Sequence, residues 1–394
     1  MTMKNQKRKI PKIRFNNFKA FWVEKRIADI VKISAGGDVD KVKLKESGKY
    51  PVVANALTNK GIVGFYDDYK VKAPAVTVTG RGDVGYAVAR HENFTPIVRL
   101  LTLQSENIDV DYLENQINSM RILNESTGVP QLTAPQLGNY KVYHPEIEEQ
   151  SAIGSLFRTL DDLLASYKDN LANYQSLKAI MLSKMFPKAG QTVPEIRLDG
   201  FEGEWEVQTL KELASFSKGN GYTKNDLVNS GKEIILYGRL YTNYQTVISK
   251  VNTFVTTVKA NTVISKGGEV IVPSSGESAE DISRASVVEK SGIILGGDLN
   301  IIYPDRNKVN SIFLALTISN GSQQKELIKR AQGKSVVHIR NNDLEKVVLN
   351  YPSIEEQQAI SSYFSNFDNL INSHQEKISQ LETLKKKILQ DMFI

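Results

Sequence analysis

The sequence predicts an α+β protein in which two globular domains alternate with two long helices. Three observations carry this prediction: a long amphipathic segment that occurs twice, a short motif that precedes each variable region, and short β-rich runs inside both regions. The long segment, residues 144–186, returns as residues 351–393, at a constant offset of 207 residues. Internal duplication of this kind indicates that the chain is built from two related halves.

The two long segments share their ends and their apolar pattern. Each opens with proline and a Glu-Glu-Gln triplet, and each closes with Met-Phe. Apolar residues recur every seven positions in both copies, as at Ile153 and Leu160 and again at Ile360 and Phe367. Such a repeat predicts a helix that needs a partner helix. The most economical partner is the other copy.

A shorter repeat precedes each variable region. Pro11-Lys12-Ile13-Arg14-Phe15 returns as Pro194-Glu195-Ile196-Arg197-Leu198, and Trp22 returns as Trp205. Pro187 ends the first long helix, which leaves a linker of only 187–193 before the second copy of this motif. Antiparallel helices fit this linker, whereas a parallel pair would make the second region bridge a rod of roughly 60 Å. We therefore expect a pseudo-two-fold chain whose C-terminus lies beside the first domain.

The two variable regions, about 23–143 and 206–350, both show a strong strand component. β-rich runs are expected at 50–54, 75–79, 86–89 and 97–101, and again at 233–237, 246–248, 269–272 and 300–303. Helices are expected at 111–124 and 308–328. The predicted division is a first globular domain at 1–143 with a basic extension at 1–10, a long helix and linker at 144–193, a second globular domain at 194–350, and a C-terminal helix at 351–394.

Composition limits the class of protein. The 394 residues include no cysteine and four histidines, which excludes disulfides and thiolate metal sites and leaves no zinc-ligand spacing. Apolar runs are too short for a transmembrane helix, and the N-terminus lacks the apolar core of a signal peptide, so a soluble cytoplasmic protein is expected. The net charge of +6 is concentrated in residues 1–30, which hold nine Lys or Arg and two Asp or Glu. This permits binding to nucleic acid without demonstrating it.

A glycine-rich string at 80–85, GRGDVG, matches the dinucleotide-binding pattern. That motif requires a helix after the last glycine, but the residues that follow are strand-like. The better interpretation is a β-turn that projects Arg81, which can then reach a guanine edge or a phosphate. The candidate contact residues at this turn are Arg81, Gly82, Asp83 and Tyr86. An ordinary solvated turn arginine is the alternative.

The second region has three comparable loops, at 218–224, 237–241 and 273–277. Each combines glycine with basic, amide, hydroxyl or tyrosine side chains, which suit contacts to base edges and phosphates. Taken singly, each is more often an ordinary polar loop. The candidate residues are Lys218, Asn220, Tyr222, Lys224, Arg239, Tyr241, Ser274 and Ser275.

No catalytic constellation stands out. The phosphate-binding pattern around Gly333-Lys334-Ser335 lacks its upstream glycine, and no methyltransferase Asn/Asp-Pro-Pro-aromatic string occurs. No nuclease carboxylate cluster or nucleophile-histidine arrangement is evident. The sequence therefore favours a binding scaffold without catalytic activity of its own.

The long helices carry more apolar side chains than the contact between the two helices, which we call the seam, can bury. A third apolar face, which widens the stripe and predicts a further partner, consists of Leu156, Leu163, Leu177, Tyr363, Leu370 and Leu384. Lys178 and Lys385 fall near the stripe itself. They are expected to lay their stems along the seam with their ammonium groups in water. The alternative is that polar seam residues fix register.

This arrangement resembles the DNA-specificity subunit of type I restriction–modification systems. The resemblance covers essentially the whole chain and lies in the two near-identical helices, which open with [HY]-P-x-I-E-E-Q and close with Met-Phe, and in PEIRLDGFEGEW before the second domain. The stretches 80–85 and 296–300 are similar to parts of that family's target recognition domains.

The resemblance implies that each variable domain reads half of a split double-stranded DNA target. It also implies that the helices set the spacer and dock two methyltransferase subunits, with restriction subunits joining the complex. S-adenosylmethionine, ATP and Mg²⁺ are then expected on the partner subunits, with no cofactor bound by this chain. Two alternatives remain: a coiled-coil protein-binding scaffold without DNA specificity, and a nucleotide-dependent enzyme built around 80–85.

Overall fold

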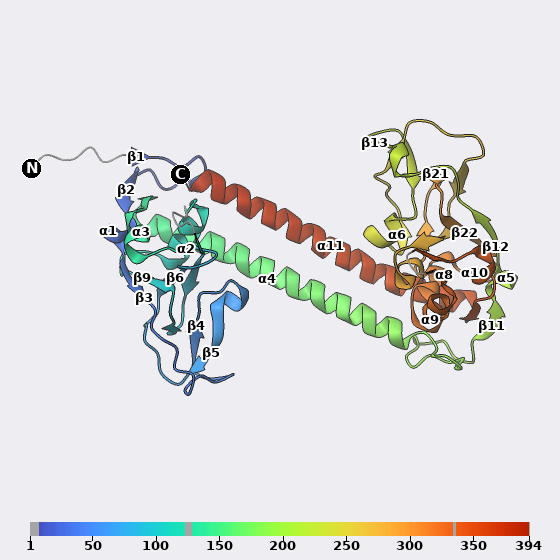
Figure 1. Cartoon of the computed structure of the whole chain (residues 1–394), viewed down its shortest axis with the longest axis horizontal. Coiled ribbons are helices and arrows are strands. Elements are labelled where there is room, and N and C mark those ends of the chain that lie inside the picture. Colours follow the sequence, from blue (N-terminus) through green and yellow to red (C-terminus); the bar gives the residue numbers. More distant parts are fainter. Residues whose placement is uncertain (1–7, 123–127, 334–335, 394) are drawn as a thin grey trace, which may run out of the picture. The chain divides into compact units, whose positions relative to one another are not determined.

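The structure is a computed structural model, and it describes residues 8–122, 128–333 and 336–393. Most of the predicted basic extension, residues 1–7, and the end of the helix predicted at 111–124 lie outside these described residues. The chain forms two compact units. Unit 1 comprises Met1–Asn170 with His374–Ile394, and unit 2 comprises Leu171–Ser373. The long helices α4 (Ile147–Lys184) and α11 (Ile354–Met392) each begin in one unit and end in the other (Figure 1).

Unit 1 contains three small sheets. The first joins β3 (Lys32–Ala35), β9 (Leu100–Gln104), β6 (Ala75–Thr79) and β7 (Ala87–Arg90), in that order. The second joins β5 (Ile62–Tyr66), β4 (Tyr50–Val53) and β8 (Thr95–Pro96). The third joins β1 (Arg8–Lys9), β2 (Trp22–Arg26) and β10 (Lys141–His144). The helices are α1 (Ile27–Ile30), the 3-10 turn η1 (Thr58–Gly61), α2 (Val110–Ser119) and α3 (Ala134–Asn139).

Unit 2 is larger but uses the same kinds of element. One sheet joins β12 (Ala214–Lys218), β22 (Leu299–Pro304), β18 (Glu269–Pro273), β20 (Ser286–Val288) and β15 (Val247–Ile248). Another joins β13 (Leu227–Val228), β16 (Phe254–Val255), β14 (Lys232–Ile235), β21 (Ser291–Leu295) and β17 (Val263–Lys266). Two-stranded sheets pair β11 (Glu206–Thr209) with β24 (Val348–Tyr351) and β19 (Ser275–Gly276) with β23 (Val337–His338). The helices are α5 (Leu210–Leu213), η2 (Lys224–Asp226), α6 (Arg239–Thr242), α7 (Ala279–Ile282), α8 (Ser311–Ile318), α9 (Gly321–Arg330) and α10 (Asn341–Leu344).

The two globular domains share one topology although their sequences differ. The order β3-β9-β6-β7 in unit 1 corresponds to β12-β22-β18-β20 in unit 2. The order β5-β4-β8 corresponds to β16-β14-β21, and in both sheets the last pair is parallel while the first is antiparallel. The additional strands of unit 2 lie at the sheet edges. Each domain is therefore a version of the same frame.

Backbone hydrogen bonds at the loops repeat from one unit to the other. Four bonds of unit 1 have counterparts at corresponding positions of unit 2. They are Gly36 N–Leu100 O with Gly219 N–Leu299 O, Ile97 N–Val53 O with Gly296 N–Ile235 O, Gly80 N–Arg99 O with Ser274 N–Asp298 O, and Leu132 N–Gly80 O with Ile339 N–Ser274 O. The turn at 80–86 in unit 1 thus corresponds to the connection that begins at Ser274 in unit 2.

The long helices pair antiparallel within each unit. In unit 1, Asp161 and Lys168 of α4 form ion pairs with Lys385 and Glu382 of α11, so residue numbers rise along one helix and fall along the other. In unit 2, Lys178 pairs with Asp368, and Phe186 stacks on Phe364. The expectation that the Lys178 and Lys385 ammonium groups lie in water is wrong, because each ammonium group is paired with an aspartate of the facing helix.

Each unit contains a cluster of four aromatic rings at the end of a long helix. In unit 1, Phe393 lies 6.5 Å from Trp22, 5.5 Å from Tyr112 and 5.8 Å from Phe157, between ring centroids. In unit 2, Phe186 makes the equivalent contacts with Trp205, Phe313 and Phe364. Each cluster thus takes one ring from the end of the helix that began in the other unit. This confirms within unit 1 that the C-terminus lies beside the first domain.

Other sequence expectations hold with small corrections. The long helices were expected at 144–186 and 351–393; both begin three residues later, because His144 and Tyr351 end strands β10 and β24. The helix expected from 111 ends at Ser119, and the one expected at 308–328 is two helices, α8 and α9. The strand expected at 97–101 begins at Leu100, since residues 98 and 99 form a turn. The domain boundaries drawn from sequence stay predictions.

Candidate nucleic-acid interface

In unit 1 the glycine-rich turn and three neighbouring loops lie together, and we call these four segments the first loop cluster. They are residues 54–61, 80–86, 97–99 and 128–132. The turn is bonded to two of the other loops through backbone groups, since Gly80 N donates to Arg99 O and Gly82 N donates to Pro130 O. The Asn55 side chain joins it to the third. Three exposed apolar side chains, Leu57, Val98 and Val129, lie on the loops that surround Arg81. Arginine flanked by apolar groups suits a base edge and a thymine methyl group.

Asn55 holds the turn in place. Its Oδ1 accepts from the backbone N–H of Gly80 at 2.6 Å and of Arg81 at 3.1 Å, and its Nδ2 donates to Arg81 O at 2.6 Å. Gly82 and Gly85 take φ values of +74° and +86°, which glycine adopts without strain. The β-turn that presents an exposed Arg81 is thereby confirmed. No helix follows Gly85, because β7 returns antiparallel to β6, so a dinucleotide-binding loop is excluded.

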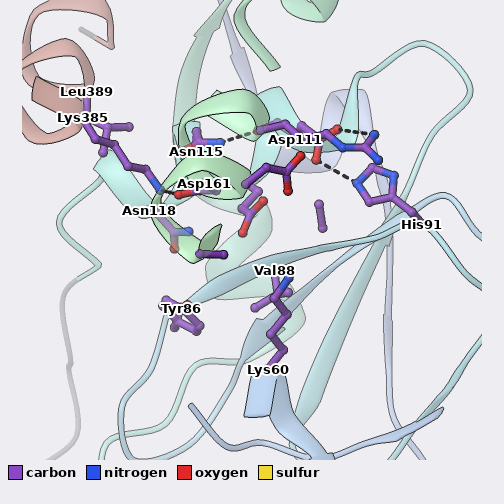
Figure 2. Close-up of a pocket in the computed structure, with 15 residues that line it drawn as sticks. Lys60, Tyr86, Val88, His91, Asp111, Asn115, Asn118, Asp161, Lys385 and Leu389 are labelled. Atoms are coloured by element: carbon purple, nitrogen blue, oxygen red, sulfur yellow. Dashed lines mark hydrogen bonds and ion pairs between the residues drawn. The ribbon is translucent and has the colours of Figure 1, made fainter. Parts of the chain in front are cut away.

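Tyr86 leaves the turn in another direction. It lines a cavity of about 670 Å³ between β7, α2, α4 and α11 of unit 1 (Figure 2). His91 and Asp111 lie 2.8 Å apart on one side of this cavity, and Lys385 and Asp161 lie 2.5 Å apart on another. Of the four residues predicted at the turn, Arg81, Gly82 and Asp83 therefore stay together, while Tyr86 belongs to the junction with the helices.

Glu114 is the perturbed carboxyl group of this cavity. Burial, with the neighbouring Asp161 and Asp111 carboxylates, raises its pKa to about 7, against the lowering effects of Lys385 and the Ala89 N–H. No group of three or more metal-ligating side chains occurs within the described residues. The cavity is thus a mixed-charge junction between the globular domain and its helix pair, with one carboxyl group that titrates near neutral pH.

Unit 2 presents a corresponding second loop cluster, which comprises residues 218–224, 236–243, 252–253, 273–277 and 296–298. Three predicted residues from two of these loops, Tyr222, Lys224 and Arg239, line one cavity of about 640 Å³. Leu227, Leu236 and Tyr237 add apolar walls, and Asn243 and Asn252 add amide groups. The size and lining are ordinary for a ligand-binding cavity. Two of the loops that were predicted from the sequence therefore lie together in the folded domain.

Not all of the selected side chains face outward. Tyr222 is 5% exposed, and its hydroxyl bonds to Thr262 at 2.9 Å and to the N–H of Lys259 at 2.7 Å. Ser274 and Ser275 are 4% and 6% exposed. The burial of Ser274 and Ser275 corrects the expectation that these two side chains face a ligand, because they shape the loops instead. Tyr222 is buried in the wall of the 640 Å³ cavity, where its hydroxyl holds a neighbouring loop.

The other candidates of unit 2 differ in accessibility. The Arg239 guanidinium donates to Asn252, Gln245 and the Lys250 carbonyl, which braces α6. Tyr241 is half-buried and packs edge-to-face against Tyr237. Lys218, Asn220 and Lys224 are exposed.

The third apolar face of the helices divides into two groups. Leu163, Leu177, Leu370 and Leu384 are 40%, 44%, 41% and 46% exposed. Leu156 and Tyr363 instead pack against the cores of their own units, so the predicted docking face is narrower than expected. The antiparallel register makes Leu163 nearly level with Leu384 in unit 1, and Leu177 nearly level with Leu370 in unit 2. Each unit thus has one exposed leucine pair.

The fold and these surfaces define a duplicated recognition scaffold, in which one α+β frame carries two different sets of loops. The model of the family described as "Type I restriction modification DNA specificity domain" matches residues 20–174 and 202–383. The chain therefore belongs to this family and contains two copies of its domain.

Known relatives agree with this assignment. The chain is 22% identical over 277 residues to the specificity subunit of the type I restriction enzyme MjaVIII of Methanocaldococcus jannaschii, covering 67% of this chain and 64% of the relative. It is 26% identical over 164 residues to a putative type I specificity subunit of Mycoplasma pneumoniae, covering 40% and 44%. The chain thus spans less than two thirds of the length of these relatives.

Solved structures share the fold. The crystal structure of a type I restriction–modification S subunit from M. genitalium matches with a TM-score of 0.68 and 16% identity, over 98% of this chain and 99% of that one. A chain from a study of complex assembly and conformational transition in the type I system matches with a TM-score of 0.51 and 15% identity, over 94% and 96%. Among the described residues, no helix has the length and apolar character to cross a membrane.

Proposed function

We propose that this chain is the sequence-specific DNA-binding subunit of a type I restriction–modification complex. Each globular domain acts as a target recognition domain for one half of a bipartite double-stranded target. The observation that carries the proposal is the repetition of one frame with different loops. Two half-sites of unrelated sequence require a common scaffold with two different contact surfaces.

The loop clusters support contact with DNA. Arg81 in unit 1 and Lys218, Asn220 and Lys224 in unit 2 are exposed on loops that the backbone holds firmly. Guanidinium, ammonium and amide groups supply the usual contacts to base edges and phosphates. Recognition on two separate domains makes half-site separation a property of the scaffold, as dimer spacing does in other DNA-binding proteins.

The paired helices α4 and α11 are proposed to set the spacer between the half-sites and to dock two methyltransferase subunits. One exposed leucine pair in each unit supports this stoichiometry, because repeated surfaces bind repeated partners. Restriction subunits are expected to join the same complex. In this proposal the chain is cytoplasmic and catalyses no reaction, and S-adenosylmethionine, ATP and Mg²⁺ are bound by the partner subunits.

Methylome sequencing of cells that carry this chain with its methyltransferase tests the proposal. A bipartite adenine-methylation motif is expected, and replacement of residues 23–143 by the equivalent region of another subunit should change only one half of it. A motif that is continuous, or that changes in both halves, would contradict the proposal.

A salt titration of binding to duplex DNA separates this function from a protein-binding scaffold. Contacts to phosphates release counterions, so the logarithm of the binding constant should fall steeply and linearly with the logarithm of salt concentration. A scaffold without DNA specificity would give no such binding, although its leucine pairs could still hold protein partners.

A further inference from the structure

Two non-glycine residues take a left-handed backbone conformation at corresponding places in the two domains. Arg99 has φ of +76° and ends the turn between β8 and β9. Asp298 has φ of +57° and ends the turn between β21 and β22. Both residues are exposed. Residues other than glycine, asparagine and aspartate seldom adopt this conformation, so Arg99 is the more unusual of the two, and such residues gather at functional sites.

The structural task of these two residues requires only backbone atoms. The Arg99 carbonyl accepts from Gly80 N at 3.0 Å, and the Asp298 carbonyl accepts from Ser274 N at 2.8 Å. Glycine would provide the same carbonyl without strain. Asp298 makes one further contact, in which its Oδ1 accepts from the Ser274 hydroxyl at a long 3.4 Å. The backbone therefore explains the turn but not the choice of an arginine and an aspartate.

Both residues lie in the loop clusters, where their side chains can contact a ligand. Arg99 lies in the first loop cluster, bonded through its carbonyl to the turn that presents Arg81. Asp298 lies in the second loop cluster and lines the 640 Å³ cavity with Lys224 and Arg239. Arginine donates to the O6 and N7 acceptors of guanine, whereas a carboxylate accepts from the N4 amino group of cytosine.

We propose that Arg99 and Asp298 are specificity-determining residues at the same position of the two recognition domains, with opposite hydrogen-bonding roles. This proposal rests on the proposed function, because it requires each domain to read one half-site. Arg99 donates to a base edge in the half-site of the first domain. Asp298 accepts from an exposed amino group in the half-site of the second.

Glycine substitutions test the proposal, because they remove the side chain and also relieve the backbone. Arg99→Gly and Asp298→Gly should keep or raise the Tm, measured on the full chain with its methyltransferase. Selection from a DNA library randomised in both half-sites should then show a loss of preference at one position. The loss expected for one bidentate contact is roughly tenfold to hundredfold. Each variant controls for the other, since Arg99→Gly must leave the second half-site unchanged and Asp298→Gly the first.

The outcomes distinguish a failure of the proposed function from a failure of the roles assigned to the two residues. If the wild-type complex selects no bipartite target, the proposed function itself fails. If the wild type selects one and both glycine variants retain its full preference, only the roles of Arg99 and Asp298 are overturned. A uniform loss over both half-sites, or a clear fall in Tm, would also overturn these roles, because the residues would then be structural.

Discussion

Arg14 and Glu149 form a buried, bidentate ion pair in which the Nε and Nη2 of the guanidinium each lie 2.6 Å from a carboxylate oxygen. The side chains are only 11% and 2% exposed. Arg197 and Glu356 repeat the pair in unit 2. The pair joins the short motif before each domain to the start of the long helix after it. Both duplicated motifs therefore serve to attach the domain to its helix.

Glu149→Gln should destabilise unit 1 by about 3–5 kcal/mol, because it leaves the Arg14 charge buried without its partner. Chemical denaturation monitored by circular dichroism measures this loss. The exposed pair between Arg26 and Asp29 is the matched control, and Asp29→Asn should have little effect on stability, because solvent screens an exposed pair. Equal effects of the two substitutions would contradict the assigned role of the buried pair.

The seam between the long helices contains repeated ion pairs that should couple measurably. Lys385 donates to Asp161 at 2.5 Å, and both side chains are partly buried. A double-mutant cycle with Lys385→Met and Asp161→Asn should give a coupling energy of about 1 kcal/mol. The exposed pair Lys168–Glu382 is the control and should couple by a few tenths of a kcal/mol. A seam pair that couples no more strongly than this control would fail to fix the register.

The duplicated helices were predictable from sequence because a seven-residue repeat has one main structural meaning. The ion pairs along the seam were not, since whether Lys178 meets water or Asp368 depends on the register of a distant segment. The partner of Arg14 lies 135 residues away, and no local signal connects the two. The sequence thus shows the repeated motif that contains Arg14, but it does not show which residue Arg14 pairs with.

The common topology of the two domains could not be predicted from the sequence either. Equivalent backbone hydrogen bonds hold the loops, and such bonds place few limits on side chains, so the two sequences diverged while the topology remained. The candidate contact loops are predicted from their glycines and polar residues. The left-handed conformation of Arg99 and Asp298 could not be read, because arginine and aspartate carry no turn signal as clear as glycine. Burial of Tyr222 and Ser274 depended on tertiary packing.

Glu114 should make stability depend on pH near neutrality. Its folded pKa of about 7 exceeds the usual 4.5, so the folded chain holds an extra proton between these values. Stability is therefore highest at low pH in this window and falls as the pH rises from about 5 to about 7, by up to roughly 3 kcal/mol. Glu114→Gln should remove this slope in denaturation curves recorded across the window. A variant with the wild-type slope would exclude Glu114 as its source.

The exposed leucine pairs should determine how many methyltransferase subunits bind. Leu163→Ser with Leu384→Ser should reduce the complex from two methyltransferase subunits to one, because the pair of unit 2 remains intact. Native mass spectrometry measures the stoichiometry, and the Tm should be unchanged since these side chains are exposed. Asp169→Ser, at an exposed position on another side of α4, is the control. Retention of two subunits by the double variant would place the docking surface elsewhere.

Asn55 should control recognition of one half-site through the turn that it holds. Asn55→Ala removes the acceptor for Gly80 and Arg81 and the donor to the Arg81 carbonyl, so Arg81 loses its fixed position. We expect a loss of about 1–2 kcal/mol in stability and roughly tenfold weaker discrimination in the half-site of the first domain, measured by selection from a randomised DNA library. Asn93→Ala is the matched control, because Asn93 accepts the Ala73 N–H at 2.9 Å far from this turn. If both variants lose stability but neither loses discrimination, Asn55 supports the fold without positioning Arg81 for recognition.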